Sequence, residues 1–286
     1  MDAVNDPLVL TPHLAERVWG GSMLGVGIGE AWDLSVHANG ASTIANGTHA
    51  GRTLAEVSTA RPDDFGGPIR LLAKRLDCAQ DLSVQVHPKR GEPKTEAWVV
   101  LASEEGAGVY HGFSEALDAD GVRAAALDGS LPQRMRFLEI EPGQCVFVPS
   151  GTVHAIGAGS LLFELQQSAD VTYRLFDWGR GRDLHLDEGL ACSDLKNVEA
   201  TPAPVPGSGG AVRLVQCEHF FIDRVGGRDA YELNPGETWV AVFVVTGSCR
   251  IGELELGAGS TVMVPRAAGP ALLEPIGSCA ALVYGP

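Results

Sequence analysis

Two short segments of the chain carry side chains that could bind a divalent metal ion. One segment, Gly143–His154, reads GQCVFVPSGTVH, and the other, Ser83–Pro88, reads SVQVHP and is soon followed by a glutamate. The four candidate ligands are Gln85, His87, Glu96 and His154. Imidazole nitrogen and carboxylate oxygen suit Zn²⁺, and also Fe²⁺, Mn²⁺ or Co²⁺. Such a donor set leaves room for water or substrate, so the sequence predicts a catalytic metal site.

The predicted site requires strands and tight turns to bring these residues together. On a strand, Gln85 and His87 point to the same face because they are two residues apart. We expect Glu96 to begin the next strand and to face them across a hairpin, and His154 to enter from another strand after a Pro-Ser-Gly turn. A lone histidine is more often structural than a ligand. That interpretation is given to the remaining six: His13, His37, His49, His111, His185 and His219.

The distribution of apolar residues predicts an all-β fold with a few short helices. Short apolar runs lie between Gly and Pro turns, at Ala97–Leu101, Cys145–Val148, Val240–Val245 and Thr261–Val264. This spacing is typical of a β-barrel or sandwich. Helices are predicted only at Leu117–Asp128, where Gly121 would interrupt it, and at Ile69–Cys78.

The segment ATPAPVPGSGG, residues 200–210, has the composition of a linker. We therefore predict a catalytic, metal-binding barrel over residues 1–200, a linker over 201–210, and a smaller barrel without metal ligands over 211–286. A chain of 286 residues is long enough for two modest cores.

Charge and targeting signals exclude several classes of partner. Lys plus Arg is 21 and Asp plus Glu is 36, which gives a net charge of −15 and argues against nucleic acid and anionic membranes. The N-terminal segment lacks the features of a signal peptide, and no apolar stretch is long enough to span a membrane. The six dispersed cysteines are interpreted as free thiols of a cytoplasmic protein. No pattern in the sequence indicates an oligomeric state.

An internal repeat relates the two sides of the linker. Residues 96–100 (EAWVV) and Gly143-x5-Pro149 match residues 237–241 (ETWVA) and Gly259-x5-Pro265. In this alignment, His154 falls opposite Pro270. The second copy therefore lacks the imidazoles, and the metal is predicted in the first copy alone.

Longer motifs extend these observations to a known family. The Gly-x5-Pro-x-Gly-x2-His and Gln-x-His…Glu segments resemble the two signature motifs of the cupin superfamily. The chain further resembles the short bacterial type I mannose-6-phosphate isomerases (phosphomannose isomerases) from about residue 7 to 190. The matching segments include GEAWDLSVH at 29–37, LLAKRLDCAQDLSVQVHP at 71–88, KTEAWVVL at 94–101 and the long run at 148–180. The resemblance implies a cupin-type scaffold and a zinc-dependent interconversion of mannose 6-phosphate and fructose 6-phosphate through an enediol(ate).

The resemblance also implies roles for individual residues. The zinc ligands correspond to the four candidates above, and the active-site arginine corresponds to Arg174. Substrate-pocket positions correspond to Trp19, Lys74, Ser83, Lys94 and Glu164. Glu164 is the first candidate for proton transfer, with Lys94 or a metal-bound water behind it; alternatively it only supports His154 or a lysine. Arg174 would stabilise the enediolate or bind the phosphate, and its alternative is a structural ion pair with Asp177.

One feature departs from the family pattern, and two other functions remain open. Only eight residues separate His87 from Glu96, and Pro93 stands where a glycine is expected, which should reshape one wall of the pocket. Lys74 and Lys94 are expected to attract the sugar phosphate. A cupin that binds sugar without turnover would not need Arg174 and Lys94. The other alternative is a different cupin enzyme, such as a dioxygenase or another sugar-phosphate isomerase. An oxygenase would hold iron and would not need this positive charge.

Overall fold

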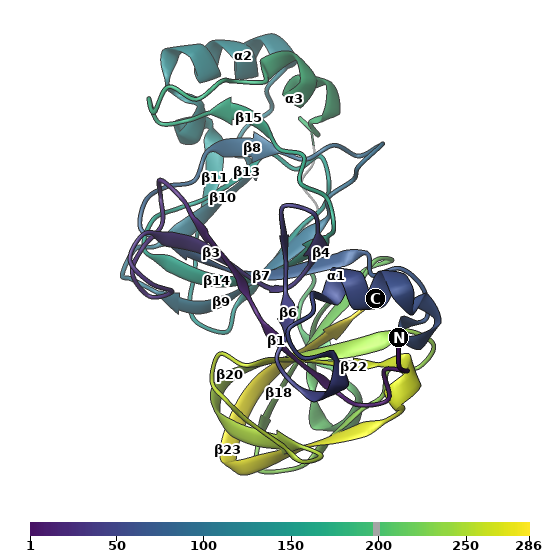
Figure 1. Cartoon of the computed structure of the whole chain (residues 1–286). Coiled ribbons are helices and arrows are strands. Elements are labelled where there is room, and N and C mark those ends of the chain that lie inside the picture. Colours follow the sequence, from purple (N-terminus) through teal and green to yellow (C-terminus); the bar gives the residue numbers. More distant parts are fainter. Residues whose placement is uncertain (197–200) are drawn as a thin grey trace. The chain divides into compact units, whose positions relative to one another are not determined.

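A computed structural model describes residues 1–196 and 201–286 (Figure 1), and these residues form two compact units. The unit made of residues 15–31 and 74–201 is called the site unit, and the unit made of residues 1–14, 32–73 and 202–286 the companion unit. Residues 1–14 and 32–73 thus group with the C-terminal part of the chain, which the sequence did not indicate. The predicted boundary at residue 200 falls outside the described residues, and the functional division of the chain remains a prediction.

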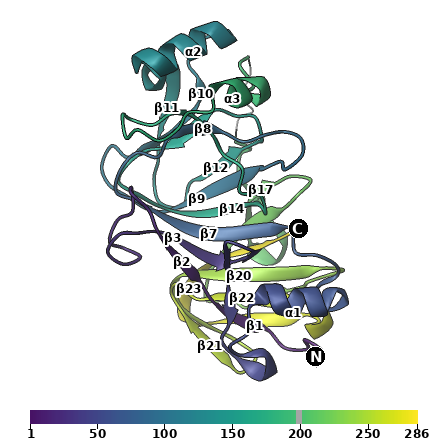
Figure 2. The same cartoon turned by 45° about the horizontal axis from the view of Figure 1, so that its top comes forward.

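Two sheets and two helices build the site unit, and β2, β3 and β7 continue into the companion unit. One sheet has the order β11 (Met135–Glu139), β10 (Gly108–Phe113), β13 (His154–Ile156), β8 (Val84–Val86) and β15 (Tyr173–Phe176). The other has the order β12 (Cys145–Val148), β9 (Glu96–Ser103), β14 (Ser160–Gln167), β7 (Leu71–Cys78), β3 (Ile28–Leu34) and β2 (His13–Glu16), and several of its strands can be followed side by side in Figure 2. The helices are α2 (Ala119–Asp128) and α3 (Leu186–Cys192), with a 3-10 turn at Leu131–Arg134.

The core of the site unit lies between its two sheets. Val109 and Ile156 of the five-stranded sheet pack in one buried cluster with Trp98, Val146 and Leu162 of the six-stranded sheet. A second cluster joins β8 and β15 to α2, so that the helix covers the outer face of the five-stranded sheet. Side chains on the inner face therefore meet across the sandwich, and this is where the candidate ligands lie.

The companion unit is built on one ten-stranded sheet. Its main order is β16 (Val205–Pro206), β17 (Val212–Gln216), β18 (Phe221–Gly227), β23 (Ala271–Gly285), β20 (Trp239–Ile251), β22 (Thr261–Pro265), β1 (Leu8–Thr11) and β6 (Thr43–Ile44). β19 (Tyr231–Leu233) pairs with β23, and β21 (Leu254–Gly257) pairs with β20. The remaining elements are β4 (Val36–His37), β5 (Gly40–Ala41), α1 (Leu54–Ala60), and 3-10 turns at Gly47–His49, Pro62–Phe65, Ser208–Gly210 and Arg266–Ala268.

The expected fold class is confirmed at the level of a mostly β protein with few helices. All four apolar runs singled out in the sequence lie on strands, namely β9, β12, β20 and β22. The proline-rich segment after residue 200 contains the short strand β16. All six cysteines are free thiols. Among the described residues, no helix is long and apolar enough to cross a membrane.

The two helix predictions have opposite outcomes. The helix at 117–128 is confirmed as α2, and Gly121 does not interrupt it, because the Asp118 side chain caps the first turn by accepting the Gly121 N–H at 2.8 Å. The helix at 69–78 is wrong. This segment forms β7, a central strand between β14 and β3 whose residues are almost all buried. Its sequence mixes apolar residues with Arg70, Lys74, Arg75 and Asp77 and lacks the period-2 alternation that marks a half-buried strand.

Both units contain the repeated strand–turn–strand frame, but its register differs from the one read in the sequence. The N–H of Gly143 donates to Val100 O at 2.8 Å, and the N–H of Gly259 donates to Val244 O, also at 2.8 Å. Both glycines have positive φ, 87° and 85°, which explains why the turn requires glycine. Val100 therefore corresponds to Val244, and the strand alignment from the sequence is three residues out of register.

Candidate active site

A cross-strand row on the five-stranded sheet places three of the predicted residues on one face. Gln85 on β8 lies opposite both His154 on β13 and Arg174 on β15. Glu96 comes from the other sheet, where β9 lies between β12 and β14. The expected hairpin between His87 and Glu96 is therefore wrong, since β8 and β9 belong to different sheets. The connection between them crosses the sandwich and brings Glu96 to the row from the opposite side.

Three of the four candidate ligands form a compact buried cluster. His87, Glu96 and His154 each offer one ligand atom, and these atoms lie within 4.8 Å of one another. His154 Nε2 is 3.3 Å from Glu96 Oε1, and His87 Nε2 is 3.6 Å from Glu96 Oε2. All three side chains are about 1% exposed. The cluster has the donor types and the spacing of a metal site.

The hydrogen bonds of the two imidazoles test whether a metal fits. His87 Nδ1 lies 2.9 Å from Val171 O, and His154 Nδ1 lies 2.9 Å from Thr152 O. A carbonyl only accepts, so both Nδ1 atoms carry the proton, and both Nε2 atoms present a lone pair toward Glu96. Glu96 Oε2 lies 2.7 Å from the ammonium group of Lys94, whereas Glu96 Oε1 has no hydrogen-bond donor among the described residues. This combination fits a divalent cation, because the imidazoles are held in the ligating tautomer.

Burial and charge keep this cluster in the protonation state that binds metal. Burial disfavours imidazolium and lowers the pKa of His154 to about 3, although Glu96 acts in the opposite direction. Burial also disfavours the Glu96 carboxylate, but the charge of Lys94 and the interaction with His87 outweigh burial and hold its pKa well below the usual value. A neutral imidazole and an ionised carboxylate therefore face each other near neutral pH.

Gln85 lies beside this cluster rather than inside it. Its Nε2 is 3.3 Å from His154 Nε2, and its Oε1 accepts a hydrogen bond from Ser83 Oγ at 3.2 Å. Amide oxygen and nitrogen are assigned from such contacts, so the same side chain can present oxygen after a flip. Ser83 thus contacts Gln85, and its assignment to the substrate pocket remains a prediction.

Two buried lysines and Glu164 form a charged network that contacts the cluster through Lys94. Lys94 Nζ lies 2.7 Å from Glu96 Oε2 and 3.2 Å from His87 Nε2. Lys74 Nζ lies 3.1 Å from Glu164 Oε1, and Lys94 Nζ lies 3.8 Å from the same oxygen. Trp98 Nε1 donates to Glu164 Oε2 at 2.9 Å. Burial lowers the pKa of Lys74, but Glu164 and Glu30 outweigh this effect and raise it overall.

A cavity of about 190 Å³ connects these residues. The predicted residues that line it are Trp19, Lys74, Ser83, Gln85, Lys94, Glu164 and Arg174. The buried histidine–carboxylate cluster joins the lining at Lys94 and Gln85. The structure therefore brings all ten predicted site residues together in one unit, and their individual roles remain predictions.

Arg174 takes no part in the ion pairs that its neighbours form. Its NH1 donates to Asp183 O at 3.0 Å, and its buried Nε has no partner among the described residues. Asp177, the expected partner of Arg174, is instead paired with Arg180 at 3.0 Å and with Arg182. Part of the Arg174 guanidinium is left to face the cavity.

Eight further residues line the cavity, and none of them is among the predicted site residues. They are the polar residues Arg17, Glu30, Asp170, Thr172 and Arg182, and the apolar residues Leu76, Leu82 and Ile156 complete the lining. Arg17 NH2 pairs with Glu30 Oε2 at 2.9 Å. The one available signal was spacing, because Arg17 lies two residues before Trp19. His111, in contrast, is buried and hydrogen-bonded to Phe147 O at 2.9 Å, which agrees with its structural interpretation.

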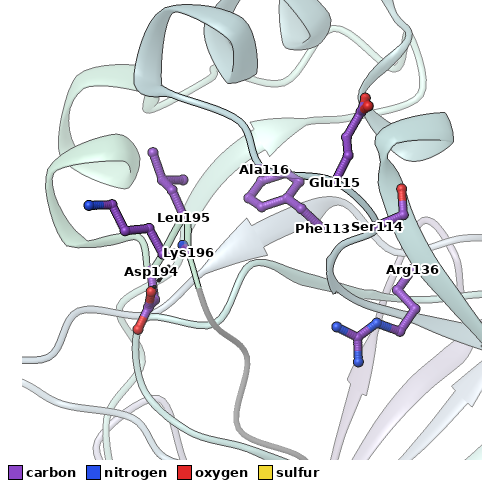
Figure 3. Close-up of a pocket in the computed structure, with 8 residues that line it drawn as sticks. All are labelled: Phe113, Ser114, Glu115, Ala116, Arg136, Asp194, Leu195 and Lys196. Atoms are coloured by element: carbon purple, nitrogen blue, oxygen red, sulfur yellow. Dashed lines mark hydrogen bonds between the residues drawn. The ribbon is translucent and has the colours of Figure 1, made fainter.

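A second cavity of the site unit, of about 250 Å³, has a different character (Figure 3). It is lined by Phe113, Ser114, Glu115, Ala116, Arg136, Asp194, Leu195 and Lys196. Glu115 is already paired with Arg134, and no candidate metal ligand lines the cavity. None of the predicted site residues lines this second cavity.

The fold and the site define a mostly β protein with a buried histidine–carboxylate cluster suited to a metal. Residues 25–105 match the family model of the phosphomannose isomerase type I catalytic domain. The chain is 32% identical to the probable mannose-6-phosphate isomerase GmuF of Bacillus subtilis, over 98% of this chain and 99% of that protein. It is 31% identical to the mannose-6-phosphate isomerase ManA of the same bacterium, over 96% and 98% of the two chains.

A solved structure agrees with these sequence relatives. The crystal structure of the mannose 6-phosphate isomerase from Bacillus subtilis matches with a TM-score of 0.89 at 28% identity, over 98% of this chain and 99% of that chain. The chain therefore belongs to the type I mannose-6-phosphate isomerase family, and it is an isomerase.

Proposed function

We propose that the chain is a zinc-dependent aldose–ketose isomerase that interconverts mannose 6-phosphate and fructose 6-phosphate. The observation that carries the proposal is the pair of imidazoles, His87 and His154, whose Nε2 atoms both face Glu96 beside a charged cavity. The relatives named for this activity match the chain over nearly its whole length. A sugar phosphate is accordingly the proposed partner, and the cytoplasm the proposed location.

The metal would be held by His87, Glu96 and His154, with Gln85 as the fourth donor. The backbone carbonyls that accept from the two Nδ1 atoms fix the rings, so binding requires little reorganisation. When bound, zinc supplies Lewis-acid stabilisation of negative charge on a substrate oxygen. The two units are proposed to be cupin-type barrels, of which only the site unit carries metal ligands.

Glu164 is proposed to move the proton between C1 and C2 of the sugar. Isomerisation passes through an enediol(ate), and a base must remove a proton next to a carbonyl. The Glu164 carboxylate is buried, lies in the cavity lining, and is oriented by Trp98 and Lys74. Lys94, at 3.8 Å from Glu164, is placed to balance the charge of the carboxylate as the proton moves.

Arg174 is proposed to bind the anionic part of the substrate. Lys74 and Lys94 each face a carboxylate at 3.1 Å and 2.7 Å, so much of their charge is neutralised within the protein. No acidic side chain of the described residues forms an ion pair with Arg174, although its guanidinium lines the cavity. A guanidinium with free donors suits a phosphate or an enediolate oxygen.

Metal depletion and restoration test the proposal. Protein stripped with a chelator should lose turnover of mannose 6-phosphate to fructose 6-phosphate in a coupled assay, and Zn²⁺ should restore it. His154→Ala should lose both metal and turnover, whereas His219→Ala in the companion unit should keep both. Zinc-replete protein without turnover would contradict the proposal, and stoichiometric native iron would favour an oxygenase instead.

A further inference from the structure

Trp98 joins the proposed base to the candidate metal cluster. Its indole N–H donates to Glu164 Oε2 at 2.9 Å, and its ring meets the His154 ring edge-on, with centroids 5.5 Å apart. The side chain is 1% exposed. Trp98 lies directly opposite Glu164 in the pairing of β9 with β14. One buried side chain therefore touches both a metal-ligand candidate and the carboxylate proposed to move the proton.

The two carboxylate oxygens of Glu164 have different partners. Oε2 accepts from the indole, while Oε1 lies near the ammonium groups of Lys74 and Lys94. Hydrogen bonds to charged groups are stronger than neutral ones and constrain orientation. Without the indole donor, the carboxylate could turn both oxygens toward the lysines and leave its proton-transfer geometry.

The companion unit shows that the frame itself does not need a tryptophan here. In the register fixed by the Gly143 and Gly259 turns, Trp98 corresponds to Val242 and Glu164 to Val283. Val242 and Val283 lie opposite each other, as Trp98 and Glu164 do. Both are buried within the companion core. The tryptophan and the carboxylate thus occur together in the unit that has the cavity, and both are replaced in the unit without the imidazoles.

We propose that Trp98 is a positioning residue, which holds Glu164 in its reactive orientation by donating the indole hydrogen bond to Oε2. The inference rests on the proposed function, because it assigns Trp98 to the same reaction. It concerns kcat rather than affinity, since Trp98 does not line the cavity.

The test is a double-mutant cycle that combines Trp98→Phe with Glu164→Gln. Loss of a hydrogen bond to a charged group corresponds to a decrease in kcat of about 10- to 100-fold. KM should stay within twofold of the parent value, and zinc content should be unchanged. In the Glu164→Gln background, Trp98→Phe should cause less than a twofold further loss, because the residues act as a unit. Trp239→Phe, a buried tryptophan in the companion unit, is the matched control and should leave kcat unchanged.

An isosteric variant at position 98 separates the loss of the hydrogen bond from a loss of packing. Benzothienylalanine at position 98 keeps the two-ring shape and lacks the N–H donor, so it should reproduce the loss of kcat with a fully folded protein. A kcat within twofold of wild type for this variant, or losses that multiply in the double mutant, would overturn the inference. Wild-type, zinc-loaded protein without turnover would instead overturn the proposed function.

Discussion

Strands β9 and β14 of the site unit and strands β20 and β23 of the companion unit share a backbone frame but carry different chemistry. Each frame has a glycine turn that returns to the same strand position, and each has a β-bulge just beyond it, after Val100 and after Val244. At equivalent positions, Glu96, Trp98 and Glu164 are replaced by Val240, Val242 and Val283.

The comparison separates what folds the frame from what acts on a substrate. Valine at all three positions fills the core of the companion unit, so the strand–turn–strand frame forms without buried charge. Burying a carboxylate has a desolvation cost that its partners must offset. In the site unit, Lys74, Lys94 and the two imidazoles provide those partners. The charged residues are therefore best explained by function rather than by folding.

The largest expected effect comes from neutralising the centre of the cluster. Glu96→Gln removes the carboxylate charge while keeping its shape, so metal content should be lost and turnover should fall about 1000-fold. Glu237→Gln is the matched control, because the sequence aligns Glu237 with Glu96 while its side chain is 91% exposed. Metal analysis and the coupled assay check both variants, and stoichiometric metal in Glu96→Gln would contradict the assignment.

Removing Arg174, which forms no ion pair with the acidic side chains of the described residues, should lower turnover less than the Glu96 substitution. Arg174→Ala is expected to lower turnover about 100-fold while the metal content stays complete, because Arg174 faces the substrate and not the cluster. Arg250→Ala, an exposed arginine of the companion unit, should change neither quantity. Steady-state kinetics with metal analysis measures both effects, and unchanged turnover in Arg174→Ala would remove it from the mechanism.

Lowering the pH should destabilise the site unit, which buries ionisable residues, before the companion unit, which has valines at the equivalent positions. The pKa of His154 falls from 6.5 to about 3 on folding, so the unfolded chain binds more protons between these values. Stability is therefore complete above about pH 6.5 and declines as the pH falls toward 3. The lowered pKa of Glu96 acts in the same direction below its usual value of 4.5.

Hydrogen exchange in metal-free protein measures this difference region by region. Between pH 7 and pH 5, after correction for the intrinsic exchange rate, β9 and β13 should lose protection while β20 and β22 keep theirs. Equal loss of protection in both pairs of strands would show that the buried charges do not set the acid sensitivity.

The smallest effect on turnover is expected from a substitution at Val242, the residue of the companion unit that corresponds to Trp98. Val242→Ala removes two buried methyl groups from a fully buried position and should lower the free energy of unfolding by about 2 kcal/mol. Turnover at a temperature where the variant is folded should remain that of wild type. Urea unfolding measures the first quantity, and a clear loss of kcat would mean that the two frames are functionally coupled.

Much of the candidate site was predictable because its signals are local. Side-chain type and short spacing identified Gln85, His87, Glu96 and His154, and the turn glycines are required by the positive φ of their own residues. The contents of the cavity were less predictable. Trp98 gave no local signal of a role, and the only local signal of Arg17 was its spacing of two residues from Trp19. Both residues act through contacts with Glu164 and Glu30, which lie elsewhere in the chain.

The sequence by itself determined the β-rich class, the donor set and the family resemblance. Tertiary structure decided that Leu71–Cys78 is a strand, that β8 and β9 lie in different sheets, and that the repeat is shifted by three residues. It also decided that Lys74 and Lys94 face carboxylates, while Arg174 does not. The physical reason is that strand pairing, burial and charge neutralisation depend on residues far apart in the chain, which local patterns do not contain.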